Sequence, residues 1–335
     1  MKDICIDITS AANEPIKNYA PGSDDRASLK SKLAKMESEF YEIPIIIGGK
    51  EIHTGNLGKC RKPHDHQHIL AEYHQAGTEE VNQAIDVVLN RKPPLVTKQA
   101  IARGIWREIG GIYWADKIER WAAKSPHVDK YDQTRRKSIY QSMPIWATRV
   151  NFVFGVGRSF KLNGNMVGSD KLGHFFSQGY KYYRRELRGE SEEKLLAKGV
   201  FAERWLFGQL TTGVYSNADL VANYEGWLFY QSLFADDVTG AKLAILRLQG
   251  DKYVKQRPFT WADHVNAYWD EALNPSFNVA SLNKRLRKSI LALCPEARQA
   301  PEHYLVTDDE GLWQRYQHIG LKDNRENQFE TICGL

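Results

Sequence analysis

The chain has 335 residues, of which 42% are hydrophobic and 26% are charged. This composition excludes a disordered chain and allows about two domains with cores of their own. The net charge of +5 is modest and no nucleic-acid-binding motif accompanies it, so we expect no nucleic-acid partner.

The cysteines and the apolar runs indicate in which cellular compartment the protein is expected. Cys5, Cys60, Cys294 and Cys333 are too far apart for a CxxC pair, and scattered thiols are more typical of a reducing compartment than of a disulfide framework. No apolar run is long enough for a transmembrane helix, and two aspartates interrupt the first ten residues, where a signal peptide would be apolar. We therefore expect a cytoplasmic protein.

Composition changes along the chain. Residues 1–90 carry 10 Lys and Arg against 14 Asp and Glu, whereas residues 91–335 carry 36 against 27. All nine tryptophans lie in the second part. The consecutive prolines Pro93-Pro94 stop a helix. The sequence therefore predicts two domains, residues 1–90 and residues 95–335.

The first domain mixes helix and strand signals. Residues 26–41 place apolar side chains three or four positions apart, which predicts an amphipathic helix. Residues 43–47 and 50–53 are β-prone runs around a Gly-Gly turn, so they predict a hairpin. A second helix is predicted over residues 78–89. We expect a small α/β segment built from helix and hairpin.

Residues 13–88 resemble the N-terminus of the 1-pyrroline-5-carboxylate dehydrogenases of the aldehyde dehydrogenase family. The likeness is carried by Asn13-Glu14-Pro15-Ile16, Tyr19–Asp24, Ile43–Thr54 and Pro63–Gly77. In that family this region only leads into the nucleotide-binding domain. The family's chemistry needs an activated cysteine, a general base and a cofactor cradle, which we do not find in context here. We expect no NAD binding, and one interpretation is a dehydrogenase fragment without its active site, fused to a second segment.

The second domain is predicted to be mainly helical. Predicted helices cover residues 98–124, 169–188, 190–210, 216–234, 260–273 and 280–293. The fold class is therefore predominantly α, with a bundle-like helical domain after the small α/β segment.

Polar residues recur at helical spacing inside three of these helices. Asp170 and His174 are four residues apart, as are Asp219 and Asn223, so each pair shares one helix face. Glu203 and Asn223 lie inside apolar helices, where a buried polar group needs a partner. The three helices can therefore direct these side chains into one bundle interior, where helical bundles build metal and acid–base sites.

The same residues resemble the motif of the VanZ-like and YfiM-like families. The matching positions are Asp170, Lys171, His174, Phe175, Glu203, Gln209, Ser216, Asp219, Ala222, Asn223 and Gly226. The resemblance implies a shared polar site, and a peripheral membrane or envelope partner and location as the alternative to the cytoplasm. VanZ-like proteins are hydrophobic membrane helices, whereas these helices are rich in charged residues.

If the cluster is catalytic, we expect hydrolase-like chemistry, either acid–base or metal-assisted. His174 is then a base or metal ligand and Glu203 an acid, base or ligand, whereas Asp219 orients His174 and Asn223 donates a hydrogen bond. Asp170 adds a carboxylate on the face of His174, and a divalent metal is the cofactor that this implies. The residues leave open a non-catalytic alternative, an interaction or envelope-associated scaffold whose polar network only fixes helix packing.

Three basic runs, residues 135–137, 181–185 and 284–288, have the charge to contact phosphates or an anionic membrane surface. The favoured interpretation is a solvated helix face, because the positive excess is spread over a long segment.

Overall fold

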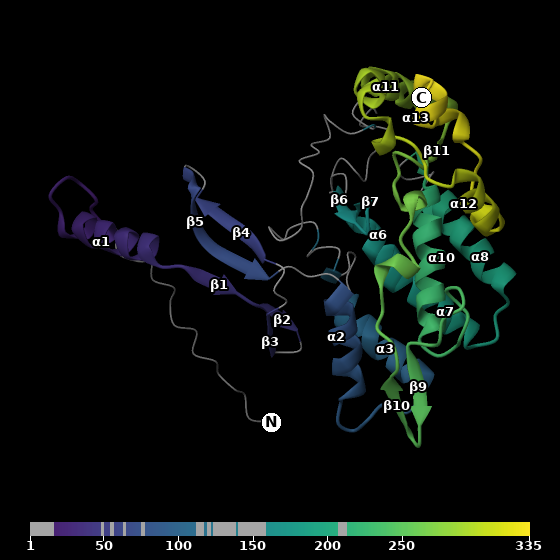
Figure 1. Ribbon diagram of the computed structural model, residues 1–335, viewed down its shortest axis with the longest axis horizontal. Coiled ribbons are helices and arrows are strands. Elements are labelled where there is room, and N and C mark those ends of the chain that lie inside the picture. Colours follow the sequence, from purple (N-terminus) through teal and green to yellow (C-terminus); the bar gives the residue numbers. More distant parts are fainter. Residues whose placement is uncertain are drawn as a thin grey trace, which may run out of the picture. The chain divides into compact units, whose positions relative to one another are not determined.

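The computed structural model describes residues 17–47, 50–53, 57–62, 65–74, 78–111, 117–118, 122, 139, 159–206 and 213–335 (Figure 1). The chain divides into two compact units, Met1–Ile43 with Leu57–Tyr73, and Pro44–Asn56 with His74–Leu335. The helix α2 (Thr78–Leu89), which the sequence assigned to residues 1–90, belongs to the second unit. Its residues Val81, Ile85 and Val88 are buried in the core of that unit.

The described residues of the first unit form one helix and one sheet. The elements are α1 (Asp24–Ser38), β1 (Tyr41–Ile43), β4 (Leu57–Lys62) and β5 (Asp65–His74), with sheet order β1-β5-β4. Ser23 caps α1, since its Oγ accepts a hydrogen bond from the backbone N–H of Arg26 at 3.3 Å. The helix forms where the sequence predicted it, but its apolar side chains are exposed, Leu33 by 54% and Met36 by 51%.

Two of the hairpins in the second unit bear on the sequence predictions and on the candidate site. The strands β2 (Ile45–Ile47) and β3 (Lys50–Ile52) pair antiparallel, which confirms the predicted hairpin. A second hairpin, β6 (Ser159–Leu162) and β7 (Asn165–Gly168), turns through Asn163 and Gly164 at φ of 47° and 82°. Asn-Gly favours this left-handed turn, and the hairpin leads directly into the first helix of the candidate site.

The rest of the second unit is mainly helical. Its longer elements are α3 (Lys98–Ile109), α6 (Ser169–Gly173), η2 (His174–Gln178), α7 (Gly179–Glu186), α8 (Glu192–Phe201), η3 (Ala202–Leu206), α10 (Asn217–Ser232), α11 (Ala280–Gln299), α12 (Asp309–Tyr316) and α13 (Phe329–Cys333). Short elements are β8 (Val214–Tyr215), β9 (Leu246–Gln249), β10 (Lys252–Lys255), β11 (Phe277–Asn278), η4 (Trp261–Asp263), η5 (Ala267–Trp269), η6 (Pro301–His303), η7 (Gln317–Ile319) and η8 (Arg325–Asn327). In Figure 1, α7 and α8 lie beside the central, largely buried α10.

Two of the predicted helices differ from the structure. The helix predicted over residues 98–124 ends at Ile109, where Gly110 is the C-cap, and most of residues 112–124 lie outside the described part of the chain. Residues 260–273 form two short 3₁₀ turns, η4 and η5, instead of one helix. Asn266 lies between them, and its side chain accepts a hydrogen bond from the backbone N–H of Tyr268 at 3.0 Å. Such a side-chain bond competes with helical hydrogen bonding, so the helix does not continue.

Aromatic side chains form the centre of the core. Phe175 packs on Phe229 and Trp261 at ring-centroid distances of 5.4 Å, and Phe259 packs on Trp261 at 4.9 Å. These rings come from η2, α10, η4 and the loop before η4, and burying them removes a large apolar surface from water. The core thus holds the helices that carry the candidate site. No helix in the described part of the chain is long and apolar enough to cross a membrane.

Cys294 and Cys333 form a disulfide between α11 and α13. The expectation of unpaired thiols is wrong for this pair. The packing of α13 on α11 brings the two Cα atoms to 5.2 Å, within the range for a disulfide, although the cysteines are 39 residues apart. Sequence spacing carries no signal of such a contact.

Candidate active site

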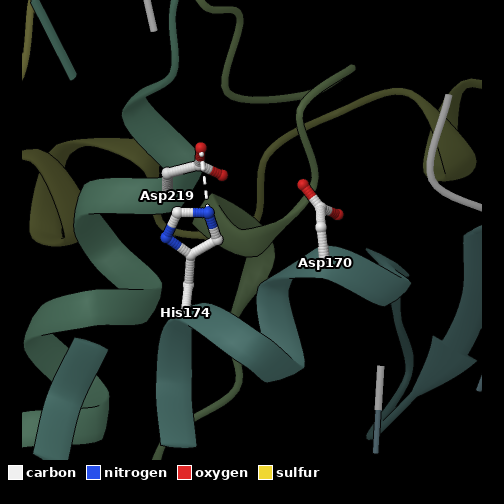
Figure 2. A group of neighbouring side chains, drawn as sticks. All are labelled: Asp170, His174 and Asp219. Carbon is white, nitrogen blue, oxygen red and sulfur yellow. Dashed lines mark ion pairs between the residues drawn. The ribbon is translucent and has the colours of Figure 1, made fainter. Parts of the chain in front are cut away.

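The π-helical turn η2 and the first turn of α10 bring the predicted polar residues together. Asp170 lies in α6, and His174 begins η2 one turn later. On the facing helix, Ser216 caps α10 by accepting a hydrogen bond from the backbone N–H of Asp219 at 3.1 Å. Figure 2 shows the His174 ring directed at the Asp219 carboxylate, with Asp170 on the same helical segment as His174. Single π turns inside helices are frequent at functional sites.

Both ring nitrogens of His174 contact oxygen atoms. Nε2 lies 3.2 Å from Asp219 Oδ2, and Nδ1 lies 2.9 Å from Asn223 Oδ1. The side chain keeps 22% of its surface exposed. Burial alone would lower the pKa of His174, but the negative charges of Asp219 and Glu203 outweigh it and raise that pKa. The imidazolium form is therefore favoured, and Asn223 is an acceptor in this contact where the sequence assigned it as a donor.

Lys171 is fully buried among three carboxylates. Its Nζ lies 2.8 Å from Asp170 Oδ2, 2.5 Å from Asp219 Oδ1 and 3.0 Å from Glu271 Oε1. Burial would lower the pKa of Lys171, but these three charges raise it well above the usual value. The ammonium group is therefore a permanent cation inside the cluster.

From the sequence, Lys171 was a motif position without an assigned role, and Glu271 was considered as an acid for the same site but not chosen. Glu271 follows η5 and also accepts a hydrogen bond from Ser216 Oγ at 2.7 Å, so the loop after residue 266 closes the cluster. Burial raises the pKa of Glu271, partly offset by Lys171. Lys171 follows Asp170 directly in the motif. A lysine inside a predicted helix bundle needs a buried partner, and this signal could have identified Lys171 as a site residue.

Glu203 interacts electrostatically with the residues of the cluster. It lies on η3 with 4% of its surface exposed. Burial, reinforced by the negative charge of Asp219, raises the pKa of Glu203 to about 8. The pKa of Asp219 moves the other way. Burial would raise it, but the charges of His174 and Lys171 lower it. Two neighbouring carboxyl groups thus differ in protonation near neutral pH, which is the arrangement that separates acid from base roles.

Three of the predicted residues could hold a metal ion. One ligand atom from each of Asp170, His174 and Asp219 lies within 4.8 Å of the others. Glu203, which the sequence proposed as a ligand with His174, is not in this group. Lys171 Nζ contacts two of the three residues, so its positive charge competes with a metal cation for the same oxygen atoms.

A second buried network, centred on Glu225 of α10, was not proposed from the sequence. Glu225 Oε1 accepts hydrogen bonds from Tyr316 Oη at 2.5 Å and Arg315 Nη2 at 2.6 Å, and Oε2 lies 3.0 Å from His264 Nδ1. A glutamate in the middle of an apolar helix was the available signal. The carboxylate is satisfied by three partners, which is typical of a structural network.

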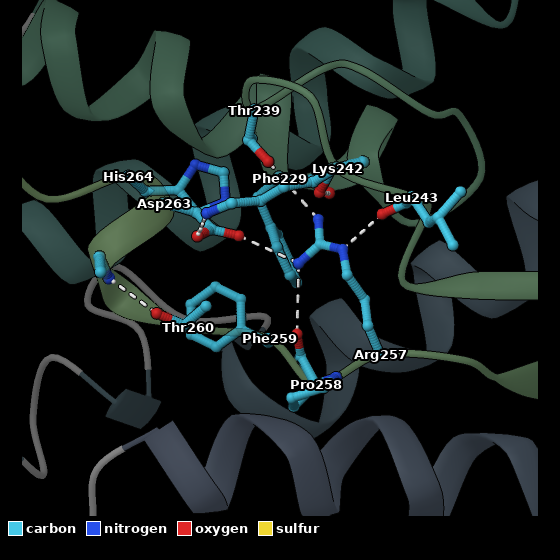
Figure 3. Close-up of polar contacts among 12 residues, drawn as sticks. Phe229, Thr239, Lys242, Leu243, Arg257, Pro258, Phe259, Thr260, Asp263 and His264 are labelled. Atoms are coloured by element: carbon cyan, nitrogen blue, oxygen red, sulfur yellow. Dashed lines mark hydrogen bonds and ion pairs between the residues drawn. The ribbon is translucent and has the colours of Figure 1, made fainter.

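The loop that carries His264 is held by its neighbour Asp263. The Asp263 carboxylate is buried and pairs with Lys242 Nζ at 2.6 Å and Arg257 Nη1 at 3.0 Å. Figure 3 shows Arg257 also reaching the backbone carbonyls of Pro258 and Leu243. These contacts fix the loop after β10 and position His264 toward α10.

Comparison with known proteins finds relatives for part of the chain. The delta-1-pyrroline-5-carboxylate dehydrogenase of Agaricus bisporus is 42% identical over 86 residues, which are 25% of this chain and 16% of that protein. The probable delta-1-pyrroline-5-carboxylate dehydrogenase of Schizosaccharomyces pombe is 41% identical over 81 residues, 24% of this chain and 15% of that protein. These matches confirm the aldehyde dehydrogenase-like segment.

The similarity covers only part of this chain and a smaller part of each relative. The crystal structure of the Mycobacterium tuberculosis Delta-pyrroline-5-carboxylate dehydrogenase is 27% identical over 27% of this chain and 16% of that chain, with a TM-score of 0.23. The chain spans 16% and 15% of the two curated relatives above. No family model matches the chain, so the VanZ-like and YfiM-like resemblance has no support from this comparison.

Proposed function

We propose that the chain joins a dehydrogenase-like N-terminal segment to a helical unit with a hydrolase-like acid–base site, in which His174 transfers the proton. One observation carries the site proposal. The His174 ring is held between Asp219 and Asn223 by both nitrogens, while 22% of its side chain stays exposed. A carboxylate that orients a partly exposed imidazole is the arrangement that positions a general acid or base.

We infer the order of proton transfer from the charges. Because its pKa is raised, His174 begins as the acid and gives a proton to the leaving group, and Asp219 stabilises the charged ring beforehand. The neutral ring then takes a proton from the attacking water, which restores the imidazolium, while Glu203, with a pKa of about 8, stays protonated near neutral pH.

The test is a hydrolysis panel of ester, amide, phosphoester and glycoside substrates. His174→Gln removes the titrating ring, and His303→Gln is the matched control because the side chain of His303 is 71% exposed. We expect one substrate class to be hydrolysed by the wild type and the control and lost in His174→Gln, with Glu203→Gln shifting the pH profile. Equal rates in all proteins, with both substituted proteins folded, would leave the cluster as a structural network.

A metal-assisted site is the second candidate, favoured by the convergence of Asp170, His174 and Asp219. Elemental mass spectrometry of the wild type and a folded His174→Ala variant separates the two. The Lys171 ammonium inside the cluster leads us to expect less than stoichiometric metal in both proteins. Stoichiometric zinc or another transition metal that is lost in His174→Ala would replace the acid–base proposal by a metal centre.

The N-terminal similarity supports the dehydrogenase-fragment part of the proposal. The matched residues are a sixth or less of the curated dehydrogenases, about 16% in the Agaricus bisporus protein. We propose that this segment alone neither binds NAD nor oxidises an aldehyde. Titration with NAD, with an intact dehydrogenase of the family as the positive control, measures this directly. Saturable NAD binding by this chain would reject it.

A further inference from the structure

A groove between α3 and α7 is lined by four arginines. It has a volume of about 410 Å³, within the range of small-molecule sites. Arg103 and Arg107 come from α3, Arg184 comes from α7, and Arg188 follows it. The groove belongs to the second unit and shares no lining residue with the His174 cluster.

The floor of this groove is a fixed aromatic pair. Trp106 and Tyr180 stack with ring centroids 5.1 Å apart and an interplanar angle of 14°. Trp106 Nε1 donates a hydrogen bond to Ser177 Oγ at 2.8 Å, which sets the orientation of the indole. An apolar floor lowers the local dielectric constant, so a charge that binds above it is attracted more strongly than in water.

All four guanidinium groups lie close enough to act on one atom. Burial raises the pKa of the Tyr180 hydroxyl, and the positive charges of Arg184, Arg103, Arg107 and Arg188 each oppose that rise. The four cations therefore all act on one hydroxyl group in the lining of the groove.

The acidic residues of these helices are engaged by other donors. Glu108 of α3 pairs with Arg91. Glu186 of α7 accepts hydrogen bonds from Trp227 Nε1 and Gln231 Nε2, both at 2.7 Å. Among the described residues, none of the groove arginines forms an ion pair, and the buried Nε of Arg184 has no hydrogen-bond acceptor. A buried guanidinium nitrogen without an acceptor is costly, so an anion that bonds to this atom would be stabilising.

We propose that this groove binds an oligophosphate, a linear di- or triphosphate group. Arginine forks bind phosphate oxygens two at a time, and four of them exceed what a single phosphate needs. Adjacent phosphates, by contrast, offer enough oxygen atoms and negative charges for all four. The same chemistry occurs in a free nucleotide and in a multiply phosphorylated lipid headgroup, and both sources are tested.

The experiment is calorimetric titration of the full chain at low salt with inorganic tripolyphosphate, ATP, orthophosphate and sulfate. We expect tripolyphosphate and ATP to bind with similar affinity, orthophosphate and sulfate to bind much more weakly, and binding to weaken as salt rises. Arg103→Gln and Arg184→Gln should each weaken tripolyphosphate binding about tenfold or more. Arg247→Gln, an exposed arginine of β9 outside the groove, is the matched control and should bind as the wild type.

The variants keep the test independent of folding. Arg103 and Arg107 are exposed, so Arg103→Gln and Arg107→Gln carry the test if Arg184→Gln unfolds. Flotation with phosphatidylcholine vesicles, with and without phosphatidylinositol bisphosphate, identifies the source. Lipid binding displaced by tripolyphosphate indicates a headgroup, and binding of soluble oligophosphates alone indicates a free ligand. No binding of any oligophosphate, or binding that the groove variants leave unchanged, overturns the proposal.

Discussion

Gly226 of α10 lies directly against the backbone carbonyl of Phe175, so that a Cβ atom at position 226 would overlap the carbonyl oxygen. Gly179 meets Gly226 from the same side, and a Cβ there would overlap the Gly226 backbone. The helical segment of His174 and the helix of Asp219 therefore touch backbone to backbone. This close approach brings the imidazole of one helix within reach of the carboxylate of the other.

Replacing Gly226 by alanine is expected to lower the free energy of unfolding by about 3 kcal/mol, because backbone cannot move aside as a side chain can. Urea unfolding measures this. Gly111→Ala is the control, since the atom nearest to its added methyl is the flexible Lys117 Cγ at 3.4 Å, and it should change stability by less than about 0.5 kcal/mol. Equal effects of the two substitutions would contradict the close crossing.

Asp219 is expected to hold the proton on His174. In Asp219→Asn the pKa of His174 should fall by about one pH unit or more, because the largest charge that opposes the effect of burial is removed. NMR titration of the labelled imidazole ring measures it. Asp323→Asn, which removes a carboxylate from the distant loop before η8, is the control and should leave the titration of His174 unchanged. An unshifted His174 in Asp219→Asn would count against the pair.

Glu203 is expected to make stability fall as the pH rises. Its pKa in the folded protein, about 8, lies above the value of an unfolded glutamate, so the folded state binds the proton more tightly. The stabilisation is complete below about pH 4 and is lost as the pH passes through about 8. Glu203→Gln should flatten this decline, measured as urea midpoints from about pH 5 to pH 9. A wild type and a variant with parallel pH profiles would show that Glu203 does not titrate in this range.

Lys171 is expected to be essential for stability, whereas a partly exposed lysine is not. Lys171→Met removes the positive charge that pairs with three carboxylates, which then remain unpaired with it. The substitution should lower the free energy of unfolding by about 3–5 kcal/mol. Lys242→Met removes a 48% exposed lysine from Asp263, which keeps Arg257, and should cost about 1 kcal/mol or less. Chemical denaturation at neutral pH compares them. Similar losses would mean that Lys171 is more hydrated than its position indicates.

The disulfide between Cys294 and Cys333 is expected to stabilise the end of the chain. It closes a 39-residue loop, for which the chain-entropy model gives about 4 kcal/mol. Cys294→Ser with Cys333→Ser should lower the thermal midpoint, whereas Cys60→Ser, at an unpaired cysteine, should not. Acid-quenched alkylation of protein from cells shows whether the pair is oxidised there. An oxidised pair would favour the envelope alternative over the cytoplasm, since cytosolic thiols are kept reduced.

Local pattern was enough to place several elements. The hairpin of Ile45–Ile47 with Lys50–Ile52 and the helix Thr78–Leu89 follow from alternation and periodicity over neighbouring residues. The pairing of Asp170 with His174 and of Asp219 with Asn223 on single helix faces follows from the same 3.6-residue repeat. The similarity of residues 13–88 to a dehydrogenase N-terminus was also evident from the sequence.

Contacts between distant residues were decided only by the tertiary structure. Lys171 and Glu271 are 100 residues apart, and neither local spacing nor composition indicates that they form one ion pair. The same holds for the cysteine pair and for the four arginines of α3 and α7, which meet because those helices pack. Residues 260–273 carried a helical pattern, yet the side chain of Asn266 and the surrounding core ended it. Periodicity reports which face of a helix is buried, whereas the partner on that face is set by how the whole chain fills its core.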